Sequence, residues 1–248
     1  MSVTAEDIRS AATALQGHII RTPMLAAPML SREFGCDLFV KLECQQYTSS
    51  FKARGAYIAM QSLNAAQRKA GVIAMSAGNH AQAVAYHAES MGIPAVIVMP
   101  AQTPFAKVAR TRAYGAEVVL EGRNLNECEG TVNMLIDKRG MTLIHPYDNV
   151  SVMTGQGTVG LEMLEDEPDL DMLVVPIGGG GLIGGIATIA REMRPNIKII
   201  GVQTKAYPTM QLAIAGKDIE CCGETLAEGI AVKKPGNVTQ PVVAQLVD

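Results

Sequence analysis

The sequence predicts an α/β protein in which helices flank open, mainly parallel sheets. Short β-branched apolar runs alternate with longer helical stretches from Gly71 onward, and such alternation favours right-handed crossovers between parallel strands. The composition is 48% hydrophobic over 248 residues, which is enough for a sizeable core. No long linker or short repeat divides the chain, so we expect two interleaved sheets rather than tethered domains.

The expected elements follow from apolar periodicity and from residues that start or stop helices. Thr4 and Asp7 form a capping pattern for an opening helix at 4–16. A short helix at 28–34 and a strand at 37–43 follow. The alternating part predicts strands at 72–75, 95–99, 117–120 and 141–144, with helices at 79–90, 104–114 and 125–138. The last part predicts a helix at 157–165, a strand at 172–177, a helix at 181–193, a strand at 198–203 and a helix at 208–215.

Charge and composition argue against several classes of partner. The net charge is −3 without a basic run, so the footprint of a binder of nucleic acid or anionic membrane is missing. The first residues lack a signal-peptide pattern, and no apolar run reaches membrane-spanning length. We therefore expect a cytoplasmic protein that binds neither nucleic acid nor membrane.

The cysteines give no reason to expect a metal. There are five of them, and no two form a Cys-x-x-Cys pair, so reduced and mostly buried thiols are expected. The acidic segment 165–171 lacks the spacing and glycine of a calcium loop. We expect no metal site. The cysteines are Cys36, Cys44, Cys128, Cys221 and Cys222.

A single lysine, Lys52, stands at the head of a predicted helix in the stretch Ser49-Ser50-Phe51-Lys52-Ala53-Arg54-Gly55. Ser49 and Ser50 are candidate N-caps. A helix N-terminus disfavours a second positive charge, so the amine should lose its proton more easily than a solvated one. A neutral amine can form a Schiff base, and pyridoxal phosphate is the usual carbonyl cofactor held this way. The alternative is a surface lysine in the first turn of an amphipathic helix.

Four glycines in Gly178-Gly179-Gly180-Gly181-Leu182 join a predicted strand to an apolar helix. Without side chains, successive backbone N–H groups can converge on one anion, and the helix N-terminus adds its dipole. The run has neither the Lys-Ser/Thr of a nucleoside-triphosphate loop nor dinucleotide spacing. It therefore predicts a cradle for a monophosphate; the alternative is a flexible turn.

The turn Ser76-Ala77-Gly78-Asn79-His80 also joins a predicted strand to a helix. It gathers a hydroxyl, an amide side chain and several backbone N–H groups, which suits a carboxylate. The alternative is that Ser76 or Asn79 simply caps the helix.

Five stretches in this order resemble the fold-type-II pyridoxal-phosphate enzymes, which share a tryptophan synthase β-subunit-like fold, and most closely the threonine/serine dehydratases. The resemblance covers nearly the whole chain and implies pyridoxal phosphate as cofactor. It implies Lys52 as the Schiff-base lysine, Phe51 beside the cofactor ring and Asn79 at its phenolic oxygen. It places Gly178, Gly179, Gly180, Gly181 and Leu182 around the phosphate, and Ser76, Ala77, Gly78, Asn79 and His80 around the substrate carboxylate. The stretches are 48–56, 76–82, 155–158, 178–182 and 225–232.

The resemblance also implies an organisation. Residues 1–66 and 145–248 would form a large cofactor-binding domain, and 67–144 a small domain that carries the substrate-carboxylate loop. Members of the family continue beyond the position of Asp248, so the C-terminal part of the large domain is expected to be missing. A homodimer or homotetramer is the family expectation.

The implied reaction is β-elimination from L-threonine or L-serine, which gives 2-oxobutanoate or pyruvate and ammonia. Similar racemases carry a serine where this chain has Ala77, which favours elimination. Gln203 and Thr209 stand where metal-binding members have acidic residues, and Glu228 stands where an aspartate is more usual. The alternatives are a serine racemase, a 3-hydroxyaspartate dehydratase-like enzyme, or a truncated protein of this fold without activity.

Overall fold

Two parallel sheets and one antiparallel pair of strands carry the fold. The computed structural model describes residues 3–219, 221 and 223–248. Its largest sheet has the order β5-β4-β3-β6 with parallel neighbours, β7 and β8 form a second parallel sheet, and β1 pairs with β2 antiparallel. The strands are β1 (Met24–Ala26), β2 (Phe39–Lys41), β3 (Val72–Met75), β4 (Ala95–Met99), β5 (Glu117–Leu120), β6 (Thr142–Leu143), β7 (Met172–Pro176) and β8 (Lys198–Val202).

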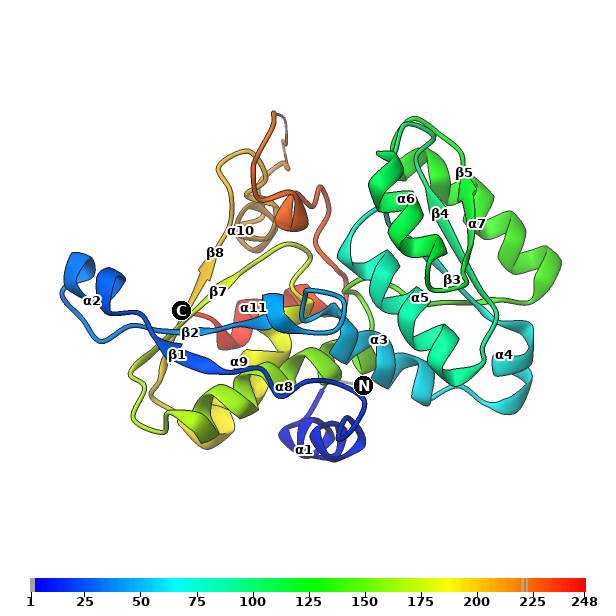
Figure 1. Cartoon of the computed structure of the whole chain (residues 1–248). Helices are drawn as coiled ribbons and strands as arrows, with labels where there is room; N and C mark the ends of the chain where they lie inside the picture. The colour runs from blue at the N-terminus through cyan, green and yellow to red at the C-terminus, as the bar shows by residue number, and fades with distance from the viewer. Residues whose placement is uncertain (1–2, 220, 222) are drawn as a thin grey trace.

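Helices cover both faces of the four-stranded sheet and one face of the β7–β8 sheet, which confirms the predicted α/β fold class. The four-stranded sheet and its helices lie at the right of Figure 1, β7 and β8 lie at the left, and α3 runs between them. The helices are α1 (Ala5–Ala14), α2 (Pro28–Phe34), α3 (Lys52–Gln61), α4 (Ala65–Ala70), α5 (Asn79–Met91), α6 (Phe105–Arg112), α7 (Leu125–Arg139), α8 (Val150–Asp166), α9 (Gly181–Met193), α10 (Thr209–Ile214) and α11 (Thr239–Leu246).

The four-stranded sheet is covered on both faces. Ala74 of β3 and Ile97 of β4 pack in one cluster with residues of α3, α5 and α6. Ile73 and Val96 point the other way and pack against α7. Successive strand residues alternate between the faces, and both faces are buried, so these strands read as continuous apolar runs in the sequence.

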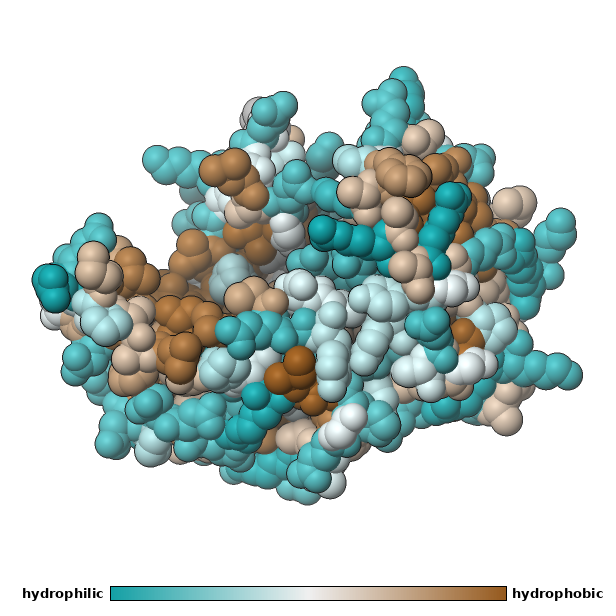
Figure 2. Space-filling model, viewed as in Figure 1, coloured by the Kyte–Doolittle hydropathy of each residue, from teal (hydrophilic) through white to brown (hydrophobic). Residues whose placement is uncertain are grey.

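The sheet of β7 and β8 is covered on one face only. Leu173 and Val175 are buried in a cluster with residues of α8, α9 and α11. The alternate residues Met172, Val174 and Val202 are 45%, 60% and 45% exposed. Figure 2 shows a hydrophobic region over this part of the molecule, next to β1 and β2.

Helices α3, α8 and α9 approach one another at glycines. A Cβ added to Gly155 of α8 would lie 2.7 Å from both the Arg54 carbonyl oxygen and the Gly55 Cα of α3. A Cβ on Gly185 of α9 would lie 2.3 Å from the Met153 carbonyl oxygen of α8. The stretch at 155–158 is therefore a helix-crossing motif.

The element bounds were largely confirmed, with three differences. The helix expected at 157–165 begins at Val150, where the Asn149 side chain accepts a hydrogen bond from the Val152 N–H. Its glycine-rich first half has low helix propensity, and burial against α3 and α9 overrides that preference. No element was predicted from the sequence at the places of β1, α4 and α11. The prediction of Ser49 or Ser50 as N-cap is wrong, because Phe51 occupies that position without a side-chain hydrogen bond.

Other expectations are only partly borne out. Cys128 is buried, but Cys36 and Cys44 are exposed, so the expectation of mostly buried thiols is wrong for these two; Cys222 lies outside the described residues. No helix in the described part of the chain combines the length and apolar character that a bilayer crossing requires. The described residues contain no group of three or more His, Cys, Asp or Glu side chains placed to hold a metal. The absence of a metal site and the domain division at 66/67 and 144/145 stay predictions.

The glycine contact between α3 and α8 gives a stability prediction. Gly155→Ala should destabilise the protein by about 2–3 kcal/mol, because the added methyl group meets backbone rather than a flexible side chain. Gly130→Ala is the matched control, since Gly130 is an exposed residue inside α7 with nothing within 4 Å of an added Cβ. It should gain about 0.5–1 kcal/mol through helix propensity. Urea unfolding of both variants tests this; equal midpoints would contradict it.

Candidate functional site

Lys52 is the first residue of α3 and is half-buried. The Nζ atom donates a hydrogen bond to the Pro146 carbonyl oxygen at 2.6 Å and lies 5.4 Å from the centroid of the Phe51 ring. Burial of the amino group lowers its pKa from the ordinary 10.5 to about 8. The predicted direction is therefore right, but the cause is desolvation rather than the helix N-terminus.

Two neutral histidines flank this amino group. His80 is buried, and its Nε2 lies 2.7 Å from the Ile144 carbonyl oxygen; because a carbonyl only accepts, Nε2 carries the proton. Burial and then the Lys52 charge lower the pKa of His80 to about 3. The pKa of His145 is also lowered by burial, and its Nδ1 accepts the N–H of Asp148 at 2.8 Å. The site therefore holds its lysine among uncharged rings near neutral pH.

The glycine run lies beside the same segment. Gly180 is the N-cap of α9 with φ 95° and no side-chain cap, which leaves the first-turn N–H groups of α9 without that partner. A Cβ on Gly179 would lie 2.2 Å from the Tyr147 ring. Pro146 accepts the hydrogen bond of Lys52, and the next residue, Tyr147, contacts the glycine run. The structure thus brings together two stretches that are far apart in sequence.

Three residues not predicted from the sequence contact the glycine run or the segment that packs on it: Tyr147, Asp148 and Thr239. Thr239 donates its hydroxyl hydrogen to the Gly179 carbonyl oxygen at 2.5 Å. The Asp148 carboxylate accepts the N–H groups of Asn237 at 2.9 Å and Val238 at 2.7 Å, which fixes the segment before Thr239. Tyr147 and Asp148 follow β6, a strand of a parallel sheet. Ligand sites collect at the carboxyl ends of such strands, so this position in the sequence could have pointed to them. Thr239 carries no local signal.

The turn at 76–80 lies at the carboxyl end of β3, where α5 begins at Asn79. Gly78 is the N-cap and offers no side-chain hydrogen bond, so the alternative that Ser76 or Asn79 caps this helix is wrong. The Ser76 hydroxyl accepts the Gly78 N–H at 3.2 Å, and Asn79 is exposed. The side chain of His80 is committed to Ile144, so only its backbone N–H remains for a ligand.

Two further predicted residues pack against one core cluster. Phe51 and Leu182 both pack against the core cluster of α9, β7 and β8. A Cβ on Gly178 would lie 3.3 Å from the Ile230 Cα and 3.5 Å from the Gly229 carbonyl oxygen, so the stretch at 225–232 covers this side. Glu228 in that stretch pairs with Lys107 of α6 at 2.8 Å.

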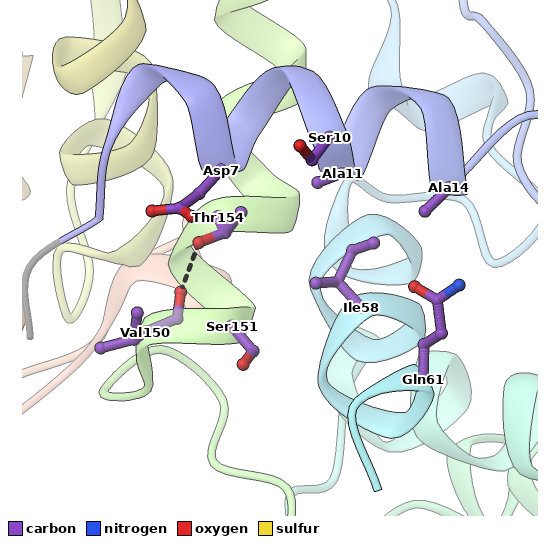
Figure 3. Close-up of a pocket in the computed structure, with 9 residues that line it drawn as sticks. All are labelled: Asp7, Ser10, Ala11, Ala14, Ile58, Gln61, Val150, Ser151 and Thr154. Atoms are coloured by element: carbon purple, nitrogen blue, oxygen red, sulfur yellow. Dashed lines mark hydrogen bonds between the residues drawn. The ribbon is translucent and has the colours of Figure 1, made fainter.

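A hollow of about 750 Å³ lies elsewhere, between α1, α3 and α8 (Figure 3). The side chains of Asp7, Ile58 and Gln61 line it, and the Thr154 hydroxyl donates to the Val150 carbonyl oxygen at its edge. None of the residues predicted for catalysis or binding lines this hollow. The candidate site is therefore identified by the residue types around Lys52 and the glycine run, and not by the size of a cavity.

Comparison with known proteins gives consistent similarities. A family profile described as "Pyridoxal-phosphate dependent enzyme" matches residues 15–248. An L-threonine ammonia-lyase of Thermotoga maritima is 44% identical over 248 residues, which is 99% of this chain and 62% of that protein. The chain thus spans less than two thirds of the length of that relative.

Solved structures show the same likeness. Maize serine racemase superimposes with a TM-score of 0.95 at 36% identity, covering 100% of this chain and 76% of that one. Threonine deaminase isoform 2 of Solanum lycopersicum gives a TM-score of 0.90 at 35% identity, covering 100% and 71%. These matches confirm the predicted fold type.

The residues present fit pyridoxal phosphate, the cofactor that the family match confirms. The amine of Lys52 is unprotonated in part near neutral pH, as attack on an aldehyde requires. Side chains at Gly179, Gly180 and Gly181 would collide with Tyr147 or Thr239, so only glycines allow the backbone of this run to take its course. The first turn of α9 adds N–H groups suited to a phosphate.

The depressed pKa of Lys52 can be measured without any ligand. Only the unprotonated amine reacts with acetic anhydride, so labelling of Lys52 should rise with pH through a midpoint of about 8 instead of the ordinary 10.5. Mass spectrometry of the peptide that contains Lys52 gives the profile, with the exposed Lys217 as an internal reference. A midpoint near the ordinary value would show that the amine is solvated.

Proposed function

Because the chain belongs to the family of pyridoxal-phosphate dependent enzymes, we propose that it is an L-threonine or L-serine ammonia-lyase. The products would be 2-oxobutanoate or pyruvate, with ammonia. The observation that carries the proposal is the half-buried Lys52, whose amine meets the Pro146 carbonyl oxygen next to Tyr147 and the glycine run. The name of the Thermotoga maritima relative supports the choice of substrate.

The geometry of the site supports the roles proposed for Lys52 and the glycine run, and the family resemblance supplies those of Phe51 and Asn79. Lys52 would bind the cofactor covalently and, once released by substrate, remove the Cα proton with its neutral amine. Bound pyridoxal phosphate supplies an electron sink that acidifies this proton. Gly178, Gly179, Gly180, Gly181 and Leu182 would hold the phosphate, Phe51 would lie beside the ring and Asn79 at its phenolic oxygen.

The turn at 76–80 would bind the substrate carboxylate through Ser76, Gly78, Asn79 and the N–H of His80. Ala77 has no hydroxyl, so it supplies no acid or base there for reprotonation at Cα. We therefore propose elimination over racemisation, although a serine racemase is among the similar structures. Elimination from a 3-hydroxyaspartate substrate and a chain of this fold without activity are the competing hypotheses.

We further propose a cytoplasmic homo-oligomer that acts on a small amino acid. The four-stranded sheet at 72–143 supports the proposed division into 67–144 and 1–66 with 145–248, and α4 (Ala65–Ala70) crosses the first boundary. The sheet of 67–144 would then carry the substrate turn, and α3 and α9 the cofactor.

Activity is the direct test of this proposal. The purified chain, incubated with pyridoxal phosphate and L-threonine or L-serine, should release 2-oxobutanoate or pyruvate in a coupled dehydrogenase assay. Lys52→Ala should reduce the rate at least about a thousandfold, since it removes both the attachment point and the base. Chiral analysis separates the racemase alternative, which predicts D-serine. Cofactor binding without any 2-oxo acid would contradict the proposal.

The glycine run gives a second prediction. Gly179→Ala should weaken pyridoxal-phosphate binding at least about tenfold, because the new methyl group displaces either Tyr147 or the loop. Gly229→Ala is the matched control, as nothing lies within 4 Å of a Cβ there. Cofactor titration followed by absorbance gives both dissociation constants. Equal values for the two variants would argue against a phosphate cradle at this run.

A further inference from the structure

The first turn of α3 contains a second cation, Arg54, whose side chain is completely buried. Its guanidinium donates two hydrogen bonds to Glu162, at 2.6 and 2.9 Å, and two to Glu43, at 2.9 and 2.7 Å. A fifth goes to the Thr158 hydroxyl at 3.1 Å. Every N–H direction of a guanidinium is thereby used, and this planar fork admits one orientation only.

The acceptors come from separate elements and are held in place themselves. Glu43 lies in the short 3-10 turn Glu43–Gln45 and accepts the Thr22 hydroxyl at 2.5 Å. Glu162 of α8 also pairs with Lys41 at 2.8 Å. Truncation of one partner in such a buried network leaves a charge uncompensated, so the members fix each other's positions.

The other side-chain contacts to the backbone at the start of α3 are single neutral hydrogen bonds. Its N-cap Phe51 makes no side-chain hydrogen bond, and the Ser50 hydroxyl is 3.4 Å from the Lys52 nitrogen. Gly55 lies against Gly155, and its N–H donates a single neutral hydrogen bond to the Gln156 side-chain oxygen of α8 at 3.2 Å. The guanidinium fork makes five hydrogen bonds, four of them to carboxylates, against this one neutral bond, so it is the stronger of the two contacts that hold the turn on α8.

We propose that Arg54 is a positioning residue for Lys52: its pairing with Glu162 and Glu43 fixes the first turn of α3, so that the Lys52 amino group lies at the Pro146 carbonyl. Pro146 stands four residues before α8 begins, and Glu162 lies within α8, so the two contacts lie on one continuous segment. The functional meaning of this proposal rests on the proposed role of Lys52, but the proposal can be tested without measuring enzyme activity.

Loss of the fork would admit water to the amino group. Burial is the cause of the low pKa of Lys52, and the titratable groups that interact with the amine, His80 and His145, both have lowered pKa values. With both rings neutral above pH 6.5, the ordinary histidine pKa, solvent access to the amine controls its titration. Rotation of the turn therefore raises the pKa of Lys52 toward its ordinary value.

Arg54→Lys tests the proposal, because it keeps the charge and removes the fork. We expect the midpoint of acetic anhydride labelling at Lys52 to rise by about one pH unit, read from fragment ions that separate residues 52 and 54. Thr158→Val removes one uncharged partner and should raise the midpoint by a smaller amount. Urea unfolding and circular dichroism, measured in parallel, separate this shift from loss of the fold.

Arg139→Lys is the matched control, because Arg139 makes a similar two-pronged contact with Glu117 at 2.6 and 3.1 Å on the surface. It should leave the midpoint unchanged. A folded Arg54→Lys protein with the parent midpoint overturns the proposal; if that variant does not fold, an unchanged midpoint in Thr158→Val does so. Absence of ammonia-lyase activity in the parent would sink the proposed function and leave this result intact.

Discussion

The buried ion network around Arg54 is the interaction on which the arrangement of this protein depends. It joins the 3-10 turn after β2, the start of α3 and the middle of α8 in a single set of contacts. Lys41 extends it to Asp166, and Arg21 pairs with Asp166 in turn. A charge taken out of water is tolerated only with geometrically good partners, so these elements have one relative placement. This placement also sets where Lys52 lies relative to the segment that contacts the glycine run.

The four-stranded sheet was largely predictable because its central strands are buried on both faces. A strand such as β4 shows a continuous apolar run, and the helices between the strands carry recognisable caps and stops. The elements that were missed or shortened depend on tertiary contacts. The first half of α8 contains Gly155 and Gly157, which oppose helix formation locally and permit it only because α3 and α9 pack there.

The candidate site was predictable for the residues that carry a chemical signature. A lone lysine at a helix start and a run of four glycines each indicate chemistry through their residue type. Tyr147, Asp148 and Thr239 do not, because they act by contact with residues remote in sequence. The cause of the lysine's depressed pKa was missed for the same reason: enclosure arises from segments that the local sequence of α3 does not include.

The glycine and glutamate of α8 that meet α3 are seven residues apart, about two helical turns, and so share one face. A single inserted or deleted residue between Gly155 and Glu162 would turn the carboxylate by about 100° around the helix, away from Arg54. Substitutions can accumulate on the other faces of α8, but a change in its length at this point would separate the two contacts. Length variation among proteins of this kind should therefore be confined to the connections outside this stretch.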